Sequence, residues 1–130
     1  EEPVEEFVAI GEEDELSQVF QNLVHNAIKY GKSDGEGYVR LFLAHIKRDK
    51  NKQEQIKVIV EDNGIGIASH HIPRLTERFY RADIEQSREK GGTGLGLAIT
   101  KHIITRHRGE LKVNSRKGHG SIFSVLLPKA

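Results

Sequence analysis

Four glycines within a six-residue stretch, directly ahead of an apolar segment, constrain this chain more than any other feature. The run reads Gly91-Gly92-Thr93-Gly94-Leu95-Gly96-Leu97-Ala98-Ile99. Because glycine has no Cβ atom, successive backbone N–H groups can turn toward one point, and a helix that follows adds free N–H donors and the positive end of its dipole. Glycines before a helix also serve as plain hinges or caps. The run therefore indicates an anion site only where other parts of the chain support one.

Composition narrows the classes of protein to consider. The chain has 130 residues, 36% hydrophobic and 30% charged, so it can bury one compact core, and we expect a single domain over residues 1–130. A formal net charge of +1 implies no dominant basic surface and argues against nucleic acid as a partner. The absence of cysteine excludes a disulfide scaffold, a thiolate zinc site and a cysteine nucleophile. No window approaches the ~18 apolar residues of a membrane span, and we expect no direct membrane contact.

Helices and strands alternate along the sequence. Apolar residues at helical spacing predict an amphipathic helix over 14–30, which Asp14 can cap and Gly31 can end. A second helix is expected over 95–107, with Gly109 placed to terminate it. Apolar runs predict strands over 39–46, 55–61, 111–115 and 121–127, and the charged run 47–54 predicts a solvent-exposed hairpin loop.

The first expected helix carries an unusual strip of polar residues. At about 100° per residue, Asn22, Asn26 and Lys29 share one strip that borders the apolar stripe. Asparagine is a poor helix former that usually caps or bonds locally, which gives these residues a plain structural interpretation. Two asparagines one turn apart within a helix also suit another role, because an amide oxygen can ligate Mg²⁺ that keeps several waters and holds phosphates. Lys29 would then face a phosphate as a point charge.

A second polar cluster, Glu61-Asp62-Asn63-Gly64-Ile65-Gly66-Ile67, follows the second expected strand. Asn-Gly after an apolar strand is a strong hairpin signal, so a simple turn is one interpretation. The residues that follow, 68–73, lack strand alternation, so we expect a loop and then a short helix. In a functional interpretation, the Asp62 carboxylate accepts a hydrogen bond from the exocyclic amine of a purine, and Gly64 and Gly66 let backbone approach the ring.

Four runs stand in fixed order along the chain: Asn22-Leu23-Val24-His25-Asn26-Ala27-Ile28-Lys29-Tyr30, Asp62-Asn63-Gly64-Ile65-Gly66-Ile67, Glu77-Arg78-Phe79-Tyr80-Arg81 and Gly92-Thr93-Gly94-Leu95-Gly96-Leu97. They resemble the asparagine box, first glycine box, phenylalanine box and second glycine box of the catalytic and ATP-binding domain of sensor histidine kinases. That domain belongs to the superfamily of gyrase, the heat-shock chaperone and the mismatch-repair ATPases. The resemblance implies an α/β fold, a two-layer sandwich in which a mixed, mostly antiparallel sheet is covered on one face by helices (the Bergerat-type ATP-binding fold).

The resemblance also implies roles for individual residues. Asn26 would ligate Mg²⁺, Asn22 would support that site, Lys29 would contact phosphate, Tyr30 would lie against adenine and Asp62 would bind the adenine amino group. Thr93 could add a hydrogen-bond donor. The glycines that would shape the pocket walls are Gly64, Gly66, Gly92, Gly94 and Gly96. Further nucleotide contacts are expected at Ile67, Phe79, Arg81, Lys90, Leu95 and Leu97. Arg81 and Lys90 flank a polar segment, 83–89, that resembles the flexible lid of the family and without ATP would be a solvated loop.

Chemistry favours a histidine as phosphoacceptor over water. The related ATP-hydrolysing proteins carry a glutamate one turn before the Mg²⁺-binding asparagine, and here that position is Asn22, an amide without useful basicity. A neutral imidazole already has a lone pair and needs mainly positioning. None of the chain's seven histidines resembles the family's acceptor motif, with His25 expected to be solvated and His102 partly buried. We therefore expect ATP binding without efficient autophosphorylation.

The resemblance implies a setting for the chain as well. The stretch 75–102 resembles the phosphate-regulon sensor kinases, and the chain would be a fragment that lacks the phosphoacceptor histidine domain. Its partners would be the dimerisation and histidine phosphoacceptor domain of the same protein and a downstream response regulator. It would be a cytoplasmic domain of an inner-membrane sensor kinase. A different class stays open, a pseudokinase-like docking module that binds nucleotide without phosphotransfer. The acidic start, 1–6, is either a linker remnant or the first edge of the sheet.

Overall fold

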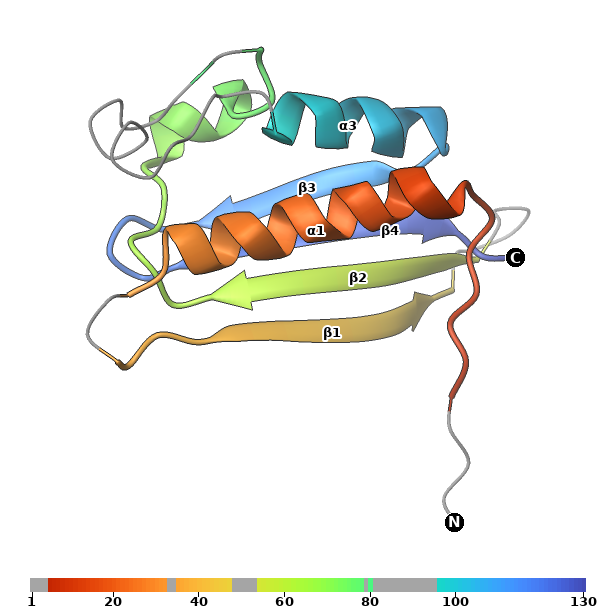
Figure 1. The fold of residues 1–130 in the computed structure, drawn as a ribbon, viewed down its shortest axis with the longest axis horizontal. Helices are drawn as coiled ribbons and strands as arrows, with labels where there is room; N and C mark the ends of the chain where they lie inside the picture. The colour runs from red at the N-terminus through yellow and green to blue at the C-terminus, as the bar shows by residue number, and fades with distance from the viewer. Residues whose placement is uncertain (1–4, 33–34, 48–53, 79, 81–95) are drawn as a thin grey trace.

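The computed structural model describes residues 5–32, 35–47, 54–78, 80 and 96–130. Two layers make up this part of the chain, a sheet and a pair of helices that cover one of its faces (Figure 1). In chain order the elements are α1 (Glu13–Lys29), β1 (Val39–Ile46), β2 (Gln55–Asp62), η1 (Ser69–Arg74), α3 (Gly96–Arg106), β3 (Glu110–Ser115) and β4 (Ser121–Pro128). The predicted α/β class and helical cover on one face are confirmed, and the short helix after the second strand is η1.

The sheet has the order β1-β2-β4-β3, and every pairing among the described strands is antiparallel. The parallel element expected of a mixed sheet is therefore absent from the described residues. Asp62, the last residue of β2, lies opposite Val39 of β1 and Ser121 of β4. Ahead of α1, Ala9 forms an antiparallel bridge with Lys129, which brings the N-terminal segment to the sheet.

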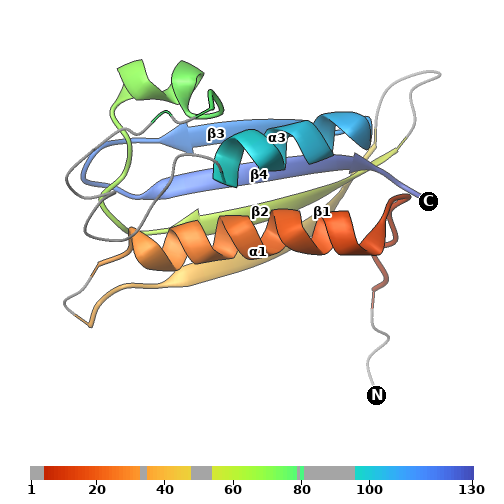
Figure 2. The same ribbon diagram turned by 45° about the horizontal axis from the view of Figure 1, so that its top comes forward.

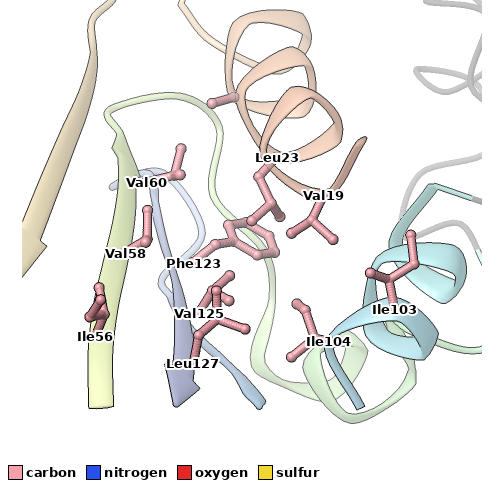
Figure 3. Packing of buried hydrophobic residues seen from close by; sticks show 11 residues of the cluster. Val19, Leu23, Ile56, Val58, Val60, Ile103, Ile104, Phe123, Val125 and Leu127 are labelled. Carbon is pink, nitrogen blue, oxygen red and sulfur yellow. The ribbon is translucent and has the colours of Figure 1, made fainter. Parts of the chain in front are cut away.

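The core lies between the helices and the sheet, where α1 packs over β2 and β1, and α3 packs over β3 (Figure 2). Figure 3 shows side chains from α1, α3, β2 and β4 meeting in one cluster. Its labelled members are Val19, Leu23, Ile56, Val58, Val60, Ile103, Ile104, Phe123, Val125 and Leu127. No helix in the described ranges is long and apolar enough to cross a membrane.

The start of α1 differs from the expected cap at Asp14. The helix begins at Glu13, its N-cap residue is Glu12, and no side chain caps it. Asp14 lies inside the first turn, where its negative charge favours the positive end of the helix dipole without capping it. Two polar contacts join α1 to α3: Asn22 Nδ2 donates to Thr100 Oγ1 at 3.3 Å, and Arg106 pairs with Glu15 at 2.8 Å.

The end of α3 also differs from the simplest expectation for Gly109. The N–H of Gly109 donates to Ile104 O at 2.9 Å and the N–H of Arg108 donates to Thr105 O at 3.0 Å, the bond pair of a Schellman motif. The left-handed residue is Arg108, with φ 60°, and not the glycine. The chain thus ends α3 with a non-glycine residue in the conformation that glycine adopts most easily.

Two expectations about burial need correction. Ile28 falls at helical spacing among the apolar residues of the predicted helix 14–30 but is 67% exposed, and His102, expected to be partly buried, is exposed. The buried face of α3 is formed by Thr100, Ile103 and Ile104, and the Thr100 hydroxyl accepts the hydrogen bond from Asn22. On the edge strand β1, exposed apolar side chains occur in succession: Leu41, Phe42 and Leu43.

Candidate functional site

The candidate site is built around Asp62, which is only 8% exposed at the C-terminal end of β2. Its Oδ1 atom accepts a hydrogen bond from the Gly64 N–H at 2.9 Å. Burial raises the pKa of the Asp62 carboxyl, and the charge of Glu61 adds to the rise, while hydrogen bonds from the backbone of Gly64 and Ser121 act in the opposite direction. The result is a desolvated acceptor that two backbone segments hold in place.

The loop after β2 is fixed from two sides. The Ile65 N–H donates to Tyr30 O at 3.3 Å, which ties the loop to the end of α1. On the other side, the Gly118 N–H donates to Ile65 O at 2.7 Å and the Ile67 N–H donates to Ser115 Oγ at 2.8 Å. The loop therefore lies between the end of α1 and the connection from β3 to β4.

Both glycines of this loop are required by contacts inside the protein. An ideal Cβ atom on Gly64 would lie 2.2 Å from Tyr30 O, and one on Gly66 would lie 2.1 Å from Arg116 O. Gly66 also has φ 69°, a conformation that other residues rarely adopt. We expected these glycines to let backbone approach a ligand ring. The structure shows a further reason for them, which is close packing of the loop against α1 and the β3–β4 connection. The approach to a ligand ring stays a prediction.

Asn63 is a site residue that sequence reasoning missed. Its Oδ1 atom accepts from the Tyr38 N–H at 2.8 Å, and its Nδ2 atom donates to Glu36 O at 2.9 Å. The side chain thus joins the segment before β1 to the residue next to Asp62. The Asn-Gly pair indicated a turn, and nothing local in the sequence pointed to a partner 25 residues away.

The comparison with known proteins decides the family. The family described as "Histidine kinase-, DNA gyrase B-, and HSP90-like ATPase" matches residues 11–130. The chain belongs to this ATPase family. The fold agrees: the mycobacterial sensor histidine kinase MprB superposes with a TM-score of 0.78 at 28% identity, covering 93% of this chain and 76% of that one.

Similar relatives of this ATPase domain are sensor kinases. The chain is 45% identical over 114 residues to the phosphate regulon sensor protein PhoR of Pseudomonas aeruginosa, covering 88% of this chain and 24% of the relative. It is 42% identical over 123 residues to PhoR of Haemophilus influenzae, covering 94% of this chain and 27% of the relative. The chain thus spans about a quarter of the length of these relatives. It is an ATP-binding domain of the histidine kinase type.

The polar strip on α1 of this ATPase domain lies where the sequence placed it, at the border of the core. Asn22, Asn26 and Lys29 are half-buried beside the buried Leu23 and Ala27. The Asn22 amide is bonded to Thr100, whereas the Asn26 side chain has no hydrogen-bond partner among the described residues. The Lys29 Nζ atom lies 5.4 Å from the centre of the Tyr30 ring.

The remaining family positions divide into two groups. Gly96 is the first residue of α3, and Leu97 is half-buried against the core. Tyr80, in the phenylalanine box, hydrogen-bonds with His71 of η1. The Arg74 Cζ atom lies over the Tyr80 ring, 4.5 Å from the centre of that ring. The predicted lid 83–89 and seven of the predicted site residues lie outside the described residues: Phe79, Arg81, Lys90, Gly92, Thr93, Gly94 and Leu95.

The donors among the described residues suit a weakly ligated, phosphate-bound metal. Within the described part of the chain, no three His, Cys, Asp or Glu side chains gather to hold an ion. Asn26 offers one neutral amide oxygen, half-buried on α1. Mg²⁺ commonly takes one or two protein ligands when phosphates and waters complete its shell. Asn26 therefore fits Mg²⁺ that arrives with a nucleotide.

Proposed function

We propose that this domain binds Mg·ATP and transfers the γ-phosphoryl group to a histidine on a separate dimerisation and phosphoacceptor domain of a longer protein. The observation that carries the proposal is the buried carboxylate of Asp62, held beside the 63–67 loop. An ionised carboxylate only accepts hydrogen bonds, so it suits the exocyclic amine at C6 of adenine. A guanine in the same orientation would present its O6 acceptor to the carboxylate, so a pocket in which C6 of the base faces Asp62 would prefer adenine.

The α1 strip supports phosphate binding next to this pocket. Asn26 would ligate the metal and Lys29 would face a phosphate as a point charge, with Tyr30 against the adenine ring. When bound, Mg²⁺ neutralises phosphate charge. The family resemblance adds Ile67, Phe79, Leu97 and the second glycine box to the pocket.

The amide at position 22 favours transfer to histidine over hydrolysis. Asn22 stands one turn before Asn26 and donates to Thr100, so it offers no basic group that could activate water. A neutral imidazole attacks through its own lone pair, and phosphoryl transfer demands mainly positioning and charge stabilisation. The lone pair forms the new N–P bond as the bond from the γ-phosphorus to the bridging oxygen breaks, and ADP leaves with that electron pair.

The relatives support a setting for the domain. They are sensor kinases of which this chain spans about a quarter, so we propose that its phosphoacceptor domain and response regulator lie elsewhere, and that this is the cytoplasmic domain of an inner-membrane sensor. Full-length ShkA, which is similar at 25% identity with a TM-score of 0.71, is described as a complex with AMPPNP. That description supports an adenine nucleotide as the ligand here.

Calorimetric titration tests the proposal directly. ATP and ADP are titrated into the chain with and without Mg²⁺, and GTP is the matched control. We expect saturable ATP binding that Mg²⁺ strengthens and at least ~10-fold weaker GTP binding, the effect of losing one well-placed polar contact. Absence of ATP binding, or equal binding of GTP, would contradict the proposal.

The phosphotransfer step needs a second assay. With the phosphoacceptor domain of the longer protein added in trans, labelled γ-phosphate should appear on that domain in an acid-labile form, and Asn26→Ala should abolish the label. Binding without any label would favour the docking-module function. Retained transfer in Asn26→Ala would overturn the assignment of Asn26 to the metal.

A further inference from the structure

The connection from β3 to β4, residues 116–120, together with Ser115 at the end of β3, contacts each of residues 65–67 in the pocket loop. Ile65 O accepts from the Gly118 N–H, Gly66 packs against Arg116 O, and the Ile67 N–H donates to Ser115 Oγ. Two of these three contacts involve backbone atoms alone. The third is the one that a side-chain substitution can remove without changing the backbone.

The Ser115 hydroxyl uses its full hydrogen-bonding capacity. It donates to Gly120 O at 2.9 Å and accepts from the Ile67 N–H at 2.8 Å. It also lies 2.7 Å from Ser121 Oγ. Because its single hydrogen is committed to Gly120, the Ser121 hydroxyl must donate in this last bond.

These bonds connect Ser115 to both sides of Asp62. Ser121 lies opposite Asp62 in the sheet, is 7% exposed, and its backbone hydrogen-bonds to the Asp62 carboxyl. Ile67 ends the loop that begins next to Asp62, where the Gly64 N–H bonds to the same carboxyl. The Ser115 hydroxyl therefore links β4, through Ser121, to the loop that follows Asp62, through Ile67.

We propose that Ser115 is a positioning residue of the nucleotide pocket, whose hydroxyl fixes the 64–67 loop and Ser121 around the Asp62 carboxylate. The inference rests on the proposed binding of ATP by this domain. Ser115 acts through Asp62 and need not touch the nucleotide. Its loss should weaken the contact that reads adenine, because a hydrogen bond to a charged acceptor depends steeply on distance and angle. Contacts to phosphate made from α1 should be unaffected.

The test compares nucleotide binding by four forms of the chain at a temperature where each is folded. Ser115→Ala removes the hydroxyl, and Ser115→Thr retains it. Ser124→Ala is the matched control, since it makes the same change at a Ser that is 3% exposed in β4, away from the pocket loop. Calorimetry gives the Kd for Mg·ATP and for Mg·GTP, and thermal unfolding gives the loss of stability.

A positioning role predicts a change in selectivity as well as in affinity. We expect Ser115→Ala to raise the Kd for ATP at least ~5-fold and the Kd for GTP less than ~2-fold, so that the preference for ATP shrinks. Ser115→Thr and Ser124→Ala should stay within ~2-fold of the unmodified chain for both nucleotides. A merely structural Ser115 would lower the unfolding temperature while leaving the ATP-to-GTP ratio unchanged, and that result overturns the proposal.

Two further outcomes are separable. If the unmodified chain fails to bind ATP, the proposed function fails and this inference fails with it. If it binds ATP and Ser115→Ala binds with the same selectivity, only the inference about Ser115 fails. Should Ser115→Ala not fold, Ser115→Cys takes its place, because a thiol is similar in shape but a weak donor and acceptor. Ser115→Cys is then expected to reduce the ATP preference, and an unchanged preference overturns the proposal.

Discussion

The Nε2 atom of His107, just past the end of α3, accepts a hydrogen bond from the backbone N–H of Glu12 at the start of α1, at 3.0 Å. The other ring nitrogen, Nδ1, lies 2.8 Å from Ile103 O, a group that only accepts. The two partners together require the neutral imidazole with its proton on Nδ1. His107 therefore joins the end of one helix to the start of the other, at a helix start that no side chain caps.

Replacing His107 should destabilise the fold well beyond an ordinary surface change. His107→Ala removes an acceptor from the Glu12 N–H and leaves a gap beside Gly11, so we expect a loss of about 1–2 kcal/mol in the free energy of unfolding. Urea denaturation followed by circular dichroism measures it. The matched control is His102→Ala on the exposed side of α3, expected within about 0.5 kcal/mol. Equal effects of the two substitutions would refute the structural role of His107.

Arg108 offers a site for stabilisation. Its φ of 60° is unfavourable for a residue with a Cβ atom but not for glycine. Arg108→Gly should therefore stabilise the chain by about 0.5–1 kcal/mol. The midpoint of urea denaturation should rise, with the slope unchanged. Arg108→Ala tests whether the side chain itself matters and should leave stability within about 0.5 kcal/mol. A destabilised Arg108→Gly would mean that contacts of the arginine outweigh its backbone strain.

Local patterns in the sequence predicted the elements well. The run 39–46 matches β1, and 14–30 differs from α1 by one residue at each end, because alternation and helical spacing reflect burial on one face. The asparagine strip also lies where spacing put it, next to the buried face. Long-range features escaped prediction for a physical reason. The bond between Glu12 and His107 spans 95 positions, and no local rule encodes it.

The helix ends show why local rules are incomplete. A glycine after an apolar helix predicts a left-handed end residue, and Gly109 was the obvious candidate. An ideal Cβ on Gly109 would lie 2.4 Å from Leu126 O, so the glycine is needed for packing against β4, and the left-handed position moves to Arg108. The same holds for Gly64 and Gly66, whose reason is the contact with Tyr30 and Arg116. Sequence shows that glycine is present but not which neighbour requires it.

Two opposed residues of the sheet should respond very differently to truncation. Val60 in β2 is fully buried, whereas its partner Leu41 in the edge strand β1 is 56% exposed. Val60→Ala should cost about 2 kcal/mol or more, through lost burial and the cavity it leaves. Leu41→Ala, which removes more atoms, should cost less than about 1 kcal/mol because water already covers much of that side chain. Denaturation of both variants measures this, and a larger loss for Leu41→Ala would show that another surface covers β1.

We expect the Asp62 carboxylate to lower the stability of the free domain and to strengthen the binding of ATP. Its pKa is raised from the ordinary value of 3.8, mainly by burial, so the folded state holds the proton more tightly than the unfolded state does. Between 3.8 and the raised value, the folded state binds more protons, and stability falls as the pH rises through that window. The buried Asp62 carboxyl therefore makes the free domain less stable at neutral pH than at acidic pH. Asp62→Asn, a neutral side chain that can still accept from the Gly64 N–H, should remove this cost.

We therefore expect Asp62→Asn to raise the unfolding temperature by a few degrees at pH 7.5 and to lose that advantage near pH 3, where the native carboxyl is protonated in both states. The same variant should bind ATP at least ~10-fold more weakly, because the amide replaces an ionised acceptor for the adenine amine. Thermal unfolding at the two pH values and calorimetry with ATP measure the two effects on one sample. Glu110→Gln, exposed at the start of β3 and away from Asp62, is the control and should shift neither quantity appreciably. A less stable Asp62→Asn at pH 7.5 would show that the ionised carboxylate stabilises the fold, and stronger ATP binding would remove Asp62 from the adenine pocket.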